Sequence, residues 1–372
     1  MIVREIYLSK IRPFIGKDII KVLTGLRRSG KSVLLKQVCD EINSINTIFL
    51  NFEDLGNQHL CEHNVFHDFI CKKIGDSKEK FYLFFDEIQE VQGWEKAVNS
   101  LRVRYNTDIY ITGSNSRLLS GDLATYIAGR YISFIVYPFS YSEFKAASDN
   151  YTLSEYIKHG GMPFLSSVGF EPEISKNYLR DVFNSVVLKD IVKRNNIRDV
   201  DLLERVIAYA LANVGKHFSD SGISKFIKAC EDAFLLYRFK CYDVNGKKML
   251  KINEKYYAAD HGLREAVVGG NLQNMEIVLE NIVGIELLRR GYRVSVGRAG
   301  EKEIDFCGEK DGEKIYIQVC YLLTGESTVY REFTSLLEIK DNYPKFVLYK
   351  ESSFSGKYEG IPALNVEDWL SG

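Results

Sequence analysis

The sequence has almost no net charge and contains no long apolar run. Its 372 residues carry 49 Lys and Arg against 50 Asp and Glu, so no overall field of either sign attracts nucleic acid or a membrane. No apolar stretch approaches the roughly 20 residues that a membrane span needs. Charges also interrupt the opening MIVREIYLSKIRPFIGKD too often for a signal peptide. We therefore expect a soluble, cytoplasmic protein without a membrane partner.

The sequence also lacks paired cysteine spacings, internal repeats and low-complexity linkers. Its seven cysteines include no CxxC pair, which favours reduced and mostly buried thiols over disulfides or a zinc ribbon. A chain of 372 residues is too long for one ordinary hydrophobic core. We therefore expect two or more domains.

The first half of the chain alternates strand-like and helix-like segments. Short apolar runs separated by helical patterns are typical of an α/β domain whose parallel sheet is buried on both faces. The expected strands are 19–25, 47–52, 81–87, 108–114 and 131–138, and the expected helices are 31–45, 58–74, 94–105 and 118–127. This first domain is predicted to span residues 1–148.

The stretch GLRRSGKS, residues 25–32, matches the phosphate-loop pattern G-x-x-x-x-G-K-[ST] between a strand and a helix. In such a loop, backbone N–H groups and the start of the helix face phosphate oxygens. Lys31 is then expected to reach the β- and γ-phosphates, and Ser32 to ligate Mg²⁺. The alternative is an ordinary turn that uses glycine for close packing. The predicted nucleotide-binding residues are Gly25, Leu26, Arg27, Arg28, Ser29, Gly30, Lys31, Ser32 and Val33, with ATP and Mg²⁺ as cofactors.

An acidic pair ends another apolar strand, FYLFFDE. Asp86 is predicted to hold the hydrated Mg²⁺, and Glu87 to act as the general base toward water. Such a pair more often marks only a solvated loop, and its combination with the phosphate loop favours the functional interpretation.

The stretch DIYITGSNS ends the strand expected at residues 108–114 with the polar residues Thr112, Ser114 and Asn115. The arrangement is similar to P-loop ATPases whose sheet has one extra strand between the phosphate-loop strand and the acidic strand. The resemblance implies that Ser114 or Asn115 senses the γ-phosphate. We expect the run TIFLNF, residues 47–52, to be the extra strand.

With these motifs the chain resembles AAA-type P-loop ATPases of bacteria and archaea that carry a C-terminal domain of unknown function. The resemblance extends over nearly the whole length and implies an ATPase that couples hydrolysis to rearrangement of a partner or an oligomer. It rests on GLRRSGKS, FFDEIQEVQGW, TGSNSRLLSGDLATYIAGRY, YPFSYSEF, GGMP, KYYAADHGLREA and EIDF with YIQVCYL.

The resemblance also suggests a role for Arg130, which directly precedes the fifth expected strand. In AAA+ proteins an arginine at this place reaches the γ-phosphate of the neighbouring subunit, which makes hydrolysis depend on assembly. The alternative is a surface or structural arginine. The expected assembly is a homo-oligomer, formed at least transiently.

Residues 149–200 are expected to form a helical connector, and residues 201–270 resemble a winged helix. The dipeptide Asn245-Gly246 predicts a two-residue hairpin turn with positive φ at both positions. Family members usually have a turn and a further helix where residues 218–239 predict one amphipathic helix, so the unit is trimmed or lacks a segment. Basic residues nearby suggest a solvated face more than a phosphate contact, so DNA or RNA is a weaker expectation. These residues are Lys189, Lys193, Arg194 and Arg198.

Residues 271–372 resemble the restriction-endonuclease fold in their order of helix, three strands, helix and strand. Glu280 and Asp305 match two of the acidic positions that such nucleases use to collect Mg²⁺. The third motif reads Gln318-Val319-Cys320 in place of E-x-K, and Cys supplies no positive charge. We therefore expect the fold without the nuclease activity.

His59, His63 and His67 recur at four-residue spacing. On one helix they would extend over about 12 Å, too far for one metal ion, so an exposed helix face is favoured over a metal site. The sequence thus predicts an oligomeric Mg²⁺-dependent ATPase. The alternatives are a nucleotide-gated interaction protein with negligible turnover and an ATP-dependent nuclease.

Overall fold

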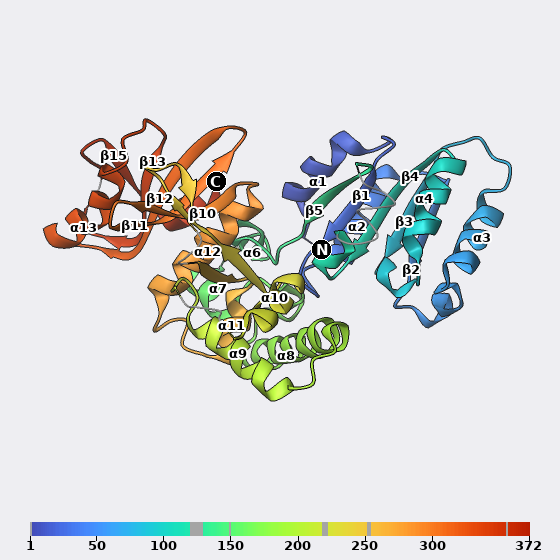
Figure 1. Cartoon of the computed structure of the whole chain (residues 1–372), viewed down its shortest axis with the longest axis horizontal. Helices are drawn as coiled ribbons and strands as arrows, with labels where there is room; N and C mark the ends of the chain where they lie inside the picture. Colours follow the sequence, from blue (N-terminus) through green and yellow to red (C-terminus); the bar gives the residue numbers. More distant parts are fainter. Residues whose placement is uncertain (1, 120–128, 149, 218–221, 251–253, 355) are drawn as a thin grey trace. The chain divides into compact units, whose positions relative to one another are not determined.

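The computed structural model describes residues 2–119, 129–148, 150–217, 222–250, 254–354 and 356–372. The chain forms two compact units, one of residues 1–137 with 232–234 and one of residues 138–231 with 235–372 (Figure 1). The helix expected at residues 118–127 falls mainly outside the described ranges. Among the described residues, no helix combines the length and apolar character needed to cross a membrane.

The first unit is built on a parallel sheet of five strands. These are β1 (Ile20–Thr24), β2 (Thr47–Asn51), β3 (Phe81–Asp86), β4 (Thr107–Gly113) and β5 (Tyr131–Ile135). All five were expected from the sequence, and their order is β2-β3-β4-β1-β5. The expectation that TIFLNF separates the phosphate-loop strand from the acidic strand is wrong. β4 lies between β1 and β3, whereas β2 forms an edge of the sheet.

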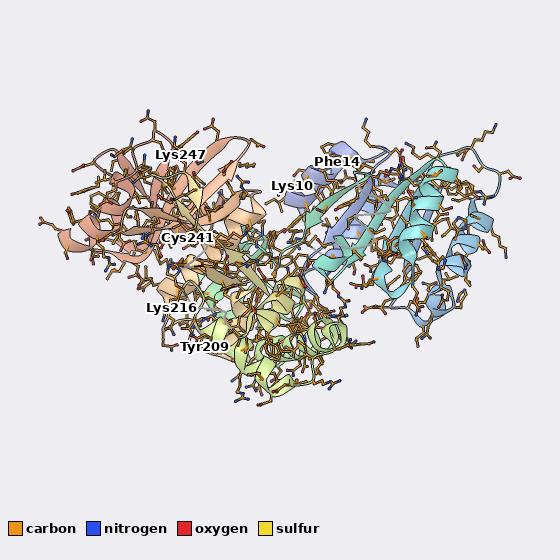
Figure 2. All side chains as sticks on the ribbon, in the orientation of Figure 1. Lys10, Phe14, Tyr209, Lys216, Cys241 and Lys247 are labelled. Atoms are coloured by element: carbon orange, nitrogen blue, oxygen red, sulfur yellow. The ribbon has the colours of Figure 1, made fainter. Side chains whose placement is uncertain are left out.

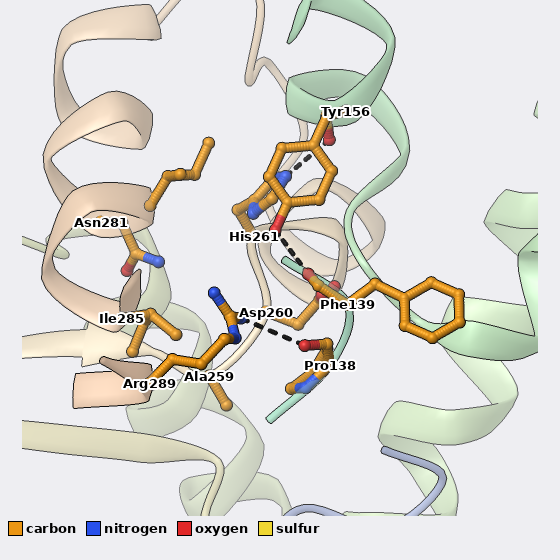
Figure 3. A pocket seen from close by; sticks show the side chains of 10 residues that line it. Pro138, Phe139, Tyr156, Ala259, Asp260, His261, Asn281, Ile285 and Arg289 are labelled. Carbon is orange, nitrogen blue, oxygen red and sulfur yellow. Dashed lines mark hydrogen bonds between the residues drawn. The ribbon is translucent and has the colours of Figure 1, made fainter. Parts of the chain in front are cut away.

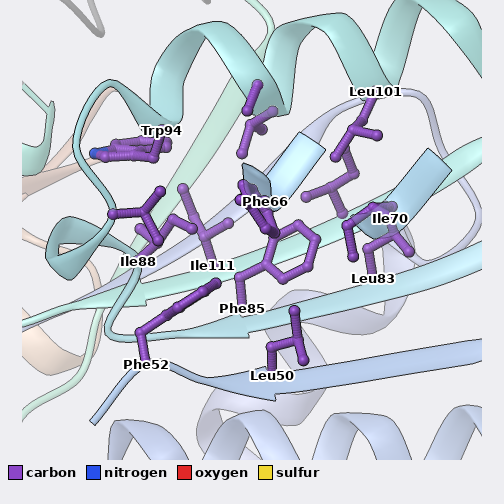
Figure 4. Packing of buried hydrophobic residues seen from close by; sticks show 14 of the residues in the cluster. Leu50, Phe52, Phe66, Ile70, Leu83, Phe85, Ile88, Trp94, Leu101 and Ile111 are labelled. Atoms are coloured by element: carbon purple, nitrogen blue, oxygen red, sulfur yellow. The ribbon is translucent and has the colours of Figure 1, made fainter. Parts of the chain in front are cut away.

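Three predicted helices pack around this sheet: α2 (Lys31–Ile42), α3 (His63–Ile74) and α4 (Trp94–Arg104). Strand alternation sends Leu83 and Phe85 of β3 into a buried cluster with Phe66 and Ile70 of α3 and Leu101 of α4 (Figure 4). This packing supports one face of the sheet. An additional helix, α1 (Glu5–Ile11), precedes β1.

The second unit contains an eight-stranded mixed sheet in the order β14-β15-β13-β12-β11-β10-β7-β8. The predicted C-terminal elements are present in the predicted sequence order, and β14, β15 and α14 add to them. The predicted ones are α12 (Met275–Arg289), β10 (Arg293–Ala299), β11 (Lys302–Lys310), β12 (Glu313–Leu323), α13 (Glu326–Leu337) and β13 (Lys345–Ser352). The added ones are β14 (Lys357–Tyr358), β15 (Ile361–Asn365) and α14 (Val366–Ser371).

Residues 200–258 contribute both helices and strands to this unit. They form α9 (Val200–Ala212), α10 (Ser224–Asp232), β6 (Leu236–Phe239), β7 (Cys241–Asp243), β8 (Lys248–Met249) and β9 (Lys255–Ala258). β6 pairs with β9, whereas β7 pairs with both β8 and β10 and so joins the large sheet. The hairpin near Asn245 therefore extends the sheet of the C-terminal domain.

The predicted two-residue turn at Asn245-Gly246 is wrong. Asp243 pairs with Lys248, so residues 244–247 connect the strands, and positive φ occurs at Lys247. The Asp243 carboxylate accepts the Gly246 N–H at 2.9 Å. This side-chain bond favours a longer turn than the dipeptide alone suggests.

Candidate functional site

The phosphate loop connects the C-terminal end of β1 to α2. Gly25 has φ 142° and lies so close to β5 that a Cβ atom there would be 2.2 Å from the Val136 carbonyl oxygen. Gly30 has φ 95° and caps the N-terminus of α2. Both positions require glycine, because L side chains disfavour this backbone and the first one has no room.

Lys31 and Ser32 begin α2 and point to different parts of the site. The Lys31 side chain is buried, and its Nζ donates to the carbonyl oxygens of Gly25 at 3.1 Å and Leu26 at 2.9 Å. The Ser32 hydroxyl donates to Asp86 Oδ1 at 3.1 Å. The loop and the end of β3 thus meet although 54 residues separate them.

Asp86 ends β3 and receives a second hydroxyl from the neighbouring strand. Thr112 of β4 donates to the same Oδ1 atom at 2.6 Å and accepts the Glu87 N–H at 2.9 Å. Burial raises the pKa of Asp86 above its ordinary range, while the bonds from Thr112 and Ser32 and the charge of Lys31 oppose that rise. The polar neighbours of this carboxylate thus offset its burial only in part.

Glu87 follows in the left-handed region with φ 54° and is buried beside Asp86. Its carboxylate is hydrogen-bonded by the Gln89 amide nitrogen. The sequence interpretation missed Gln89, whose position two residues after the acidic pair was its only signal.

The loop is also surrounded by buried polar atoms that are suited to a ligand. Thr24 Oγ1, Ser29 Oγ and Gln89 Oε1 are buried and have no hydrogen-bond partner within the described ranges. Unpaired buried groups are costly and uncommon in folded proteins. Together with the two glycines, the buried lysine and Asp86, they fit a phosphate group and a hydrated cation.

The other predicted residues of this site lie near the same carboxyl ends of the strands. Leu26, Ser114 and Asn115 are buried, and Arg27 pairs with Glu53 at 3.1 Å. Arg28 is exposed with φ 66°, and Val33 is 40% exposed. The carboxyl ends of β1, β3 and β4 thus bring the phosphate loop, the acidic pair and the polar turn together.

Arg130 does not join this group. It is exposed and directly precedes β5, and its carbonyl oxygen accepts the N–H of Ile20, the first residue of β1. Its Nη1 atom lies 3.4 Å from Asn99 Oδ1. Because β1 and β5 are parallel, Arg130 lies at the amino ends of these strands, whereas the phosphate loop of the same chain follows the carboxyl end of β1.

The predicted residues of the C-terminal domain line a cavity of about 660 Å³ within the second unit. Glu280 of α12, Asp305 of β11 and Gln318 of β12 all contribute to its wall, as does Lys216, labelled in Figure 2. Cys320 instead belongs to the buried core of this unit. The two acidic positions are therefore brought together, and the Cys position is kept away from the cavity.

Sequence reasoning missed Lys255, which opens β9 and is buried beside this cavity. Its Nζ contacts Glu280 at 3.1 Å and Glu303 at 2.6 Å. Burial lowers the pKa of Lys255, but the charges of Glu280, Asp305 and Glu303 raise it overall. A lysine at the head of the otherwise apolar KYYA run was the available signal.

The histidines and the basic residues of the connector are dispersed. His59 lies in a short helix, Leu55–Leu60, whereas His63 and His67 lie on α3. Within the described residues no three His, Cys, Asp or Glu side chains are grouped so as to hold a metal ion. Lys189, Lys193 and Arg198 are exposed, and Arg194 pairs with the buried Asp190 at 3.3 Å.

Comparison with known proteins agrees with the first unit's fold. Residues 17–145 match a family described as an AAA domain, and residues 150–274 match a domain of unknown function. An uncharacterized protein of Haemophilus influenzae is 42% identical over 399 residues, which cover 100% of this chain and 98% of that protein. An uncharacterized protein of Methanocaldococcus jannaschii is 28% identical over 99% of this chain and 91% of its own length. Among solved structures, a Walker-type ATPase of Pyrococcus abyssi aligns with a TM-score of 0.48 and 14% identity, over 72% of this chain and 96% of its own.

Proposed function

This chain belongs to the family of the Haemophilus influenzae relative and carries an AAA domain at residues 17–145, and from that premise we propose that it binds and hydrolyses ATP with Mg²⁺. The observation that carries the proposal is the convergence of Ser32 and Thr112 on one oxygen of Asp86. A loop, a helix start and two strand ends meet there. Hydroxyl, carboxylate and ammonium groups thus lie close together, which supports binding of a phosphate and its cation.

The phosphate loop, residues 25–33, would hold the triphosphate through its backbone N–H groups and the start of α2. Lys31 would leave the Gly25 and Leu26 carbonyl oxygens to contact the β- and γ-phosphates. Ser32 and Asp86 would hold Mg²⁺, which is commonly bound by one or two carboxylates, waters and substrate phosphates. When bound, Mg²⁺ neutralises charge on the phosphate oxygens.

Glu87 would accept a proton from the attacking water. The water oxygen bonds to the γ-phosphorus, and the bond from that phosphorus to the β–γ bridging oxygen breaks, which yields ADP and phosphate. Ser114 and Asn115 follow β4 at the same edge and would contact the γ-phosphate. Gln89 must release or reorient the Glu87 carboxylate for this step, because its amide binds that carboxylate.

Arg130 would act on the nucleotide of a neighbouring subunit. Within its own chain it is separated from the phosphate loop by the five residues of β1, which span about 16 Å at 3.3 Å per residue. An arginine supplied across an interface stabilises the charge of the transition state. We therefore propose a homo-oligomer as the active form.

We further propose that hydrolysis drives rearrangement of this oligomer or of a partner bound by the C-terminal half. In this proposal the ATPase domain spans 1–148, followed by a helical connector (149–200), a winged-helix-like unit (201–270) and a restriction-endonuclease-like domain (271–372). Nucleic acid remains the weaker partner class, because basic residues on a helical segment more often form a solvated face and one of the four, Arg194, pairs with the buried Asp190.

The test is Mg²⁺-dependent ATP turnover of the full chain and of Lys31→Ala and Glu87→Gln. The matched controls are Lys36→Ala, on the exposed side of α2, and Glu90→Gln, on the exposed side of the next turn. We expect Lys31→Ala to lose nucleotide binding and Glu87→Gln to keep binding but turn over about 10²-fold more slowly or worse. Both controls should resemble the wild type.

Equal turnover by the wild type and Glu87→Gln would remove Glu87 from the mechanism. Nucleotide binding without turnover in the wild type would favour the nucleotide-gated interaction protein. Repeating the assay with DNA and with RNA identifies the partner class, because a nucleic-acid partner should stimulate turnover.

The second candidate function is an ATP-dependent nuclease, which one observation favours. Glu280 and Asp305 line one cavity, and Lys255 supplies beside it the positive charge that Cys320 does not. The nucleic acid from the same reactions is run on a gel. Mg²⁺-dependent cutting that is lost in Asp305→Asn would support this candidate, and intact nucleic acid with the wild type would reject it.

A further inference from the structure

Arg4 is a buried arginine that lies before the segment matching the AAA family. It precedes α1, is 1% exposed, and stacks on the Tyr7 ring at 4.7 Å from the ring centre. Its Nη1 donates to the Ser29 carbonyl oxygen at 2.9 Å, and its Nη2 to the Tyr137 carbonyl oxygen at 2.9 Å. One guanidinium group thus joins the phosphate loop to the end of the first unit.

The same residues behind the loop are held by the sheet. The Val136 N–H donates to the Thr24 carbonyl oxygen at 2.7 Å, and the Val136 carbonyl oxygen lies against Gly25. The Tyr137 N–H donates to the Tyr7 hydroxyl at 3.0 Å. Val136 and Tyr137, the last two residues of this part of the first unit, therefore pack behind the phosphate loop.

The next two residues are fixed within the second unit (Figure 3). The Pro138 carbonyl oxygen accepts a bond from Arg289 at 3.1 Å. The Phe139 carbonyl oxygen accepts the Tyr156 hydroxyl at 2.7 Å, and the Phe139 N–H donates to Gly161 at 2.6 Å. Residues 136–139, here called the interunit segment, are thus hydrogen-bonded at every position.

We propose that Arg4 is a positioning residue. It transmits the binding of phosphate in the loop to the interunit segment, and through that segment to the second unit. This inference rests on the proposed nucleotide binding. Ser29 belongs to the loop, so closure of the loop on phosphate shifts the carbonyl oxygen that Arg4 binds. A buried guanidinium is costly to leave unpaired, so Arg4 and Tyr137 must follow that shift.

The test measures hydrogen exchange at the Phe139 amide with and without a non-hydrolysable ATP analogue, beside a direct assay of nucleotide binding. In the wild type we expect the nucleotide to change this exchange rate about tenfold, the effect of roughly 1.4 kcal/mol. Arg4→Lys keeps the charge, but its single ammonium cannot bridge two separate carbonyl oxygens as the planar fork does. We expect it to bind nucleotide while the Phe139 response falls below about twofold, on the same scale.

Arg12→Lys is the matched control, because Arg12 is an exposed arginine of the same N-terminal segment that pairs with Glu5 and Glu41. Tyr7→Phe provides a second variant that removes the hydroxyl held by the Tyr137 N–H and leaves Arg4 in place. It should also weaken the Phe139 response. A full response in both Arg4→Lys and Tyr7→Phe, or no response in a wild type that binds nucleotide, would overturn the role of Arg4. A wild type that binds no nucleotide overturns the proposed function as well.

Discussion

Asp86 is a residue of the candidate site whose ionisation costs free energy in the folded protein. Two hydroxyls and a nearby lysine favour its ionised form, yet burial still raises the pKa of Asp86 above the ordinary range. A raised pKa in the folded state means that ionisation costs the folded protein more than the unfolded chain. Stability at this site is therefore full at low pH and is lost as the pH rises.

We predict that Asp86→Asn raises the melting temperature of the nucleotide-free protein and abolishes ATP turnover. The Asn oxygen still accepts from Ser32 and Thr112, but position 86 no longer carries a buried charge. The stabilisation should be near zero below about pH 4 and grow toward neutral pH. Each kcal/mol of added stability raises the melting temperature by about 2–4 °C. Thermal melts of both proteins across this pH range check the prediction.

The control for this prediction is Asp40→Asn, which removes an exposed carboxylate from α2. It should leave the melting temperature nearly unchanged at every pH. A stabilisation of Asp86→Asn that is the same at pH 4 and pH 7 would show that the buried charge is not its cause.

At the scale of elements, the unit of strand β1, phosphate loop and helix α2 depends on Gly25. Its φ of 142° and the Val136 oxygen behind it leave no space for a side chain. This close approach also places Val136 directly behind the loop.

We predict that Gly25→Ala destabilises the first unit by about 3 kcal/mol or more, through backbone strain and the clash together. It should also abolish nucleotide binding. The chain has two tryptophans, of which Trp94 lies in the first unit and Trp369 in the second. Denaturation followed by fluorescence in a Trp369→Phe background therefore reports on the first unit.

Gly75→Ala is the matched control, because Gly75 has φ 61° and nothing within 4 Å of its would-be Cβ. With ψ −137° its backbone also lies outside the conformations that L residues favour, so the substitution should cost only this strain, about 1–3 kcal/mol. If both variants lost the same stability, the close contact with Val136 would have no energetic role.

At the scale of the whole molecule, Arg130 and the phosphate loop lie at opposite ends of the neighbouring strands β5 and β1. A single chain therefore cannot bring them together across the length of β1. If Arg130 takes part in hydrolysis, the active site is shared between two copies.

We predict that wild-type turnover per chain rises with protein concentration, whereas Arg130→Ala stays about 10³-fold lower at every concentration. Mixing Arg130→Ala with Lys31→Ala should restore activity. In mixed assemblies one variant supplies an intact loop and the other an intact arginine. Steady-state assays of each variant and of the mixture check this prediction.

Arg104→Ala, which removes an exposed arginine of α4, is the control and should behave as the wild type. Absence of activity in the mixture, or an unaffected Arg130→Ala, would return Arg130 to a structural role.

Much of the first unit could be predicted because its signals are local. Short apolar runs predicted all five strands, although only β1 and β4 are buried throughout and the edge strands β2 and β5 are partly exposed. The phosphate-loop pattern indicated where β1 gives way to α2. Ser32, Asp86 and Glu87 were identified by their place at strand and loop ends. Their convergence follows from the parallel sheet, whose carboxyl ends share one edge.

What could not be predicted depends on contacts between distant residues. The place of β4 between β1 and β3 and the four-residue turn at 244–247 depend on partners that no short window contains. Gln89, Lys255 and Arg4 carry no motif, and their importance appears only where Glu87, Glu280 and Ser29 meet them.

The strands, the phosphate loop and the acidic pair could thus be predicted from the amino-acid sequence, because local periodicity and spacing encode burial and turn geometry. The strand order and the separation of Arg130 from the phosphate loop of its own chain instead follow from contacts between distant residues. The positions of the buried lysine and arginine side chains around the two sites also depend on tertiary contacts, because the cost of burying a charge is met by partners far away in the chain.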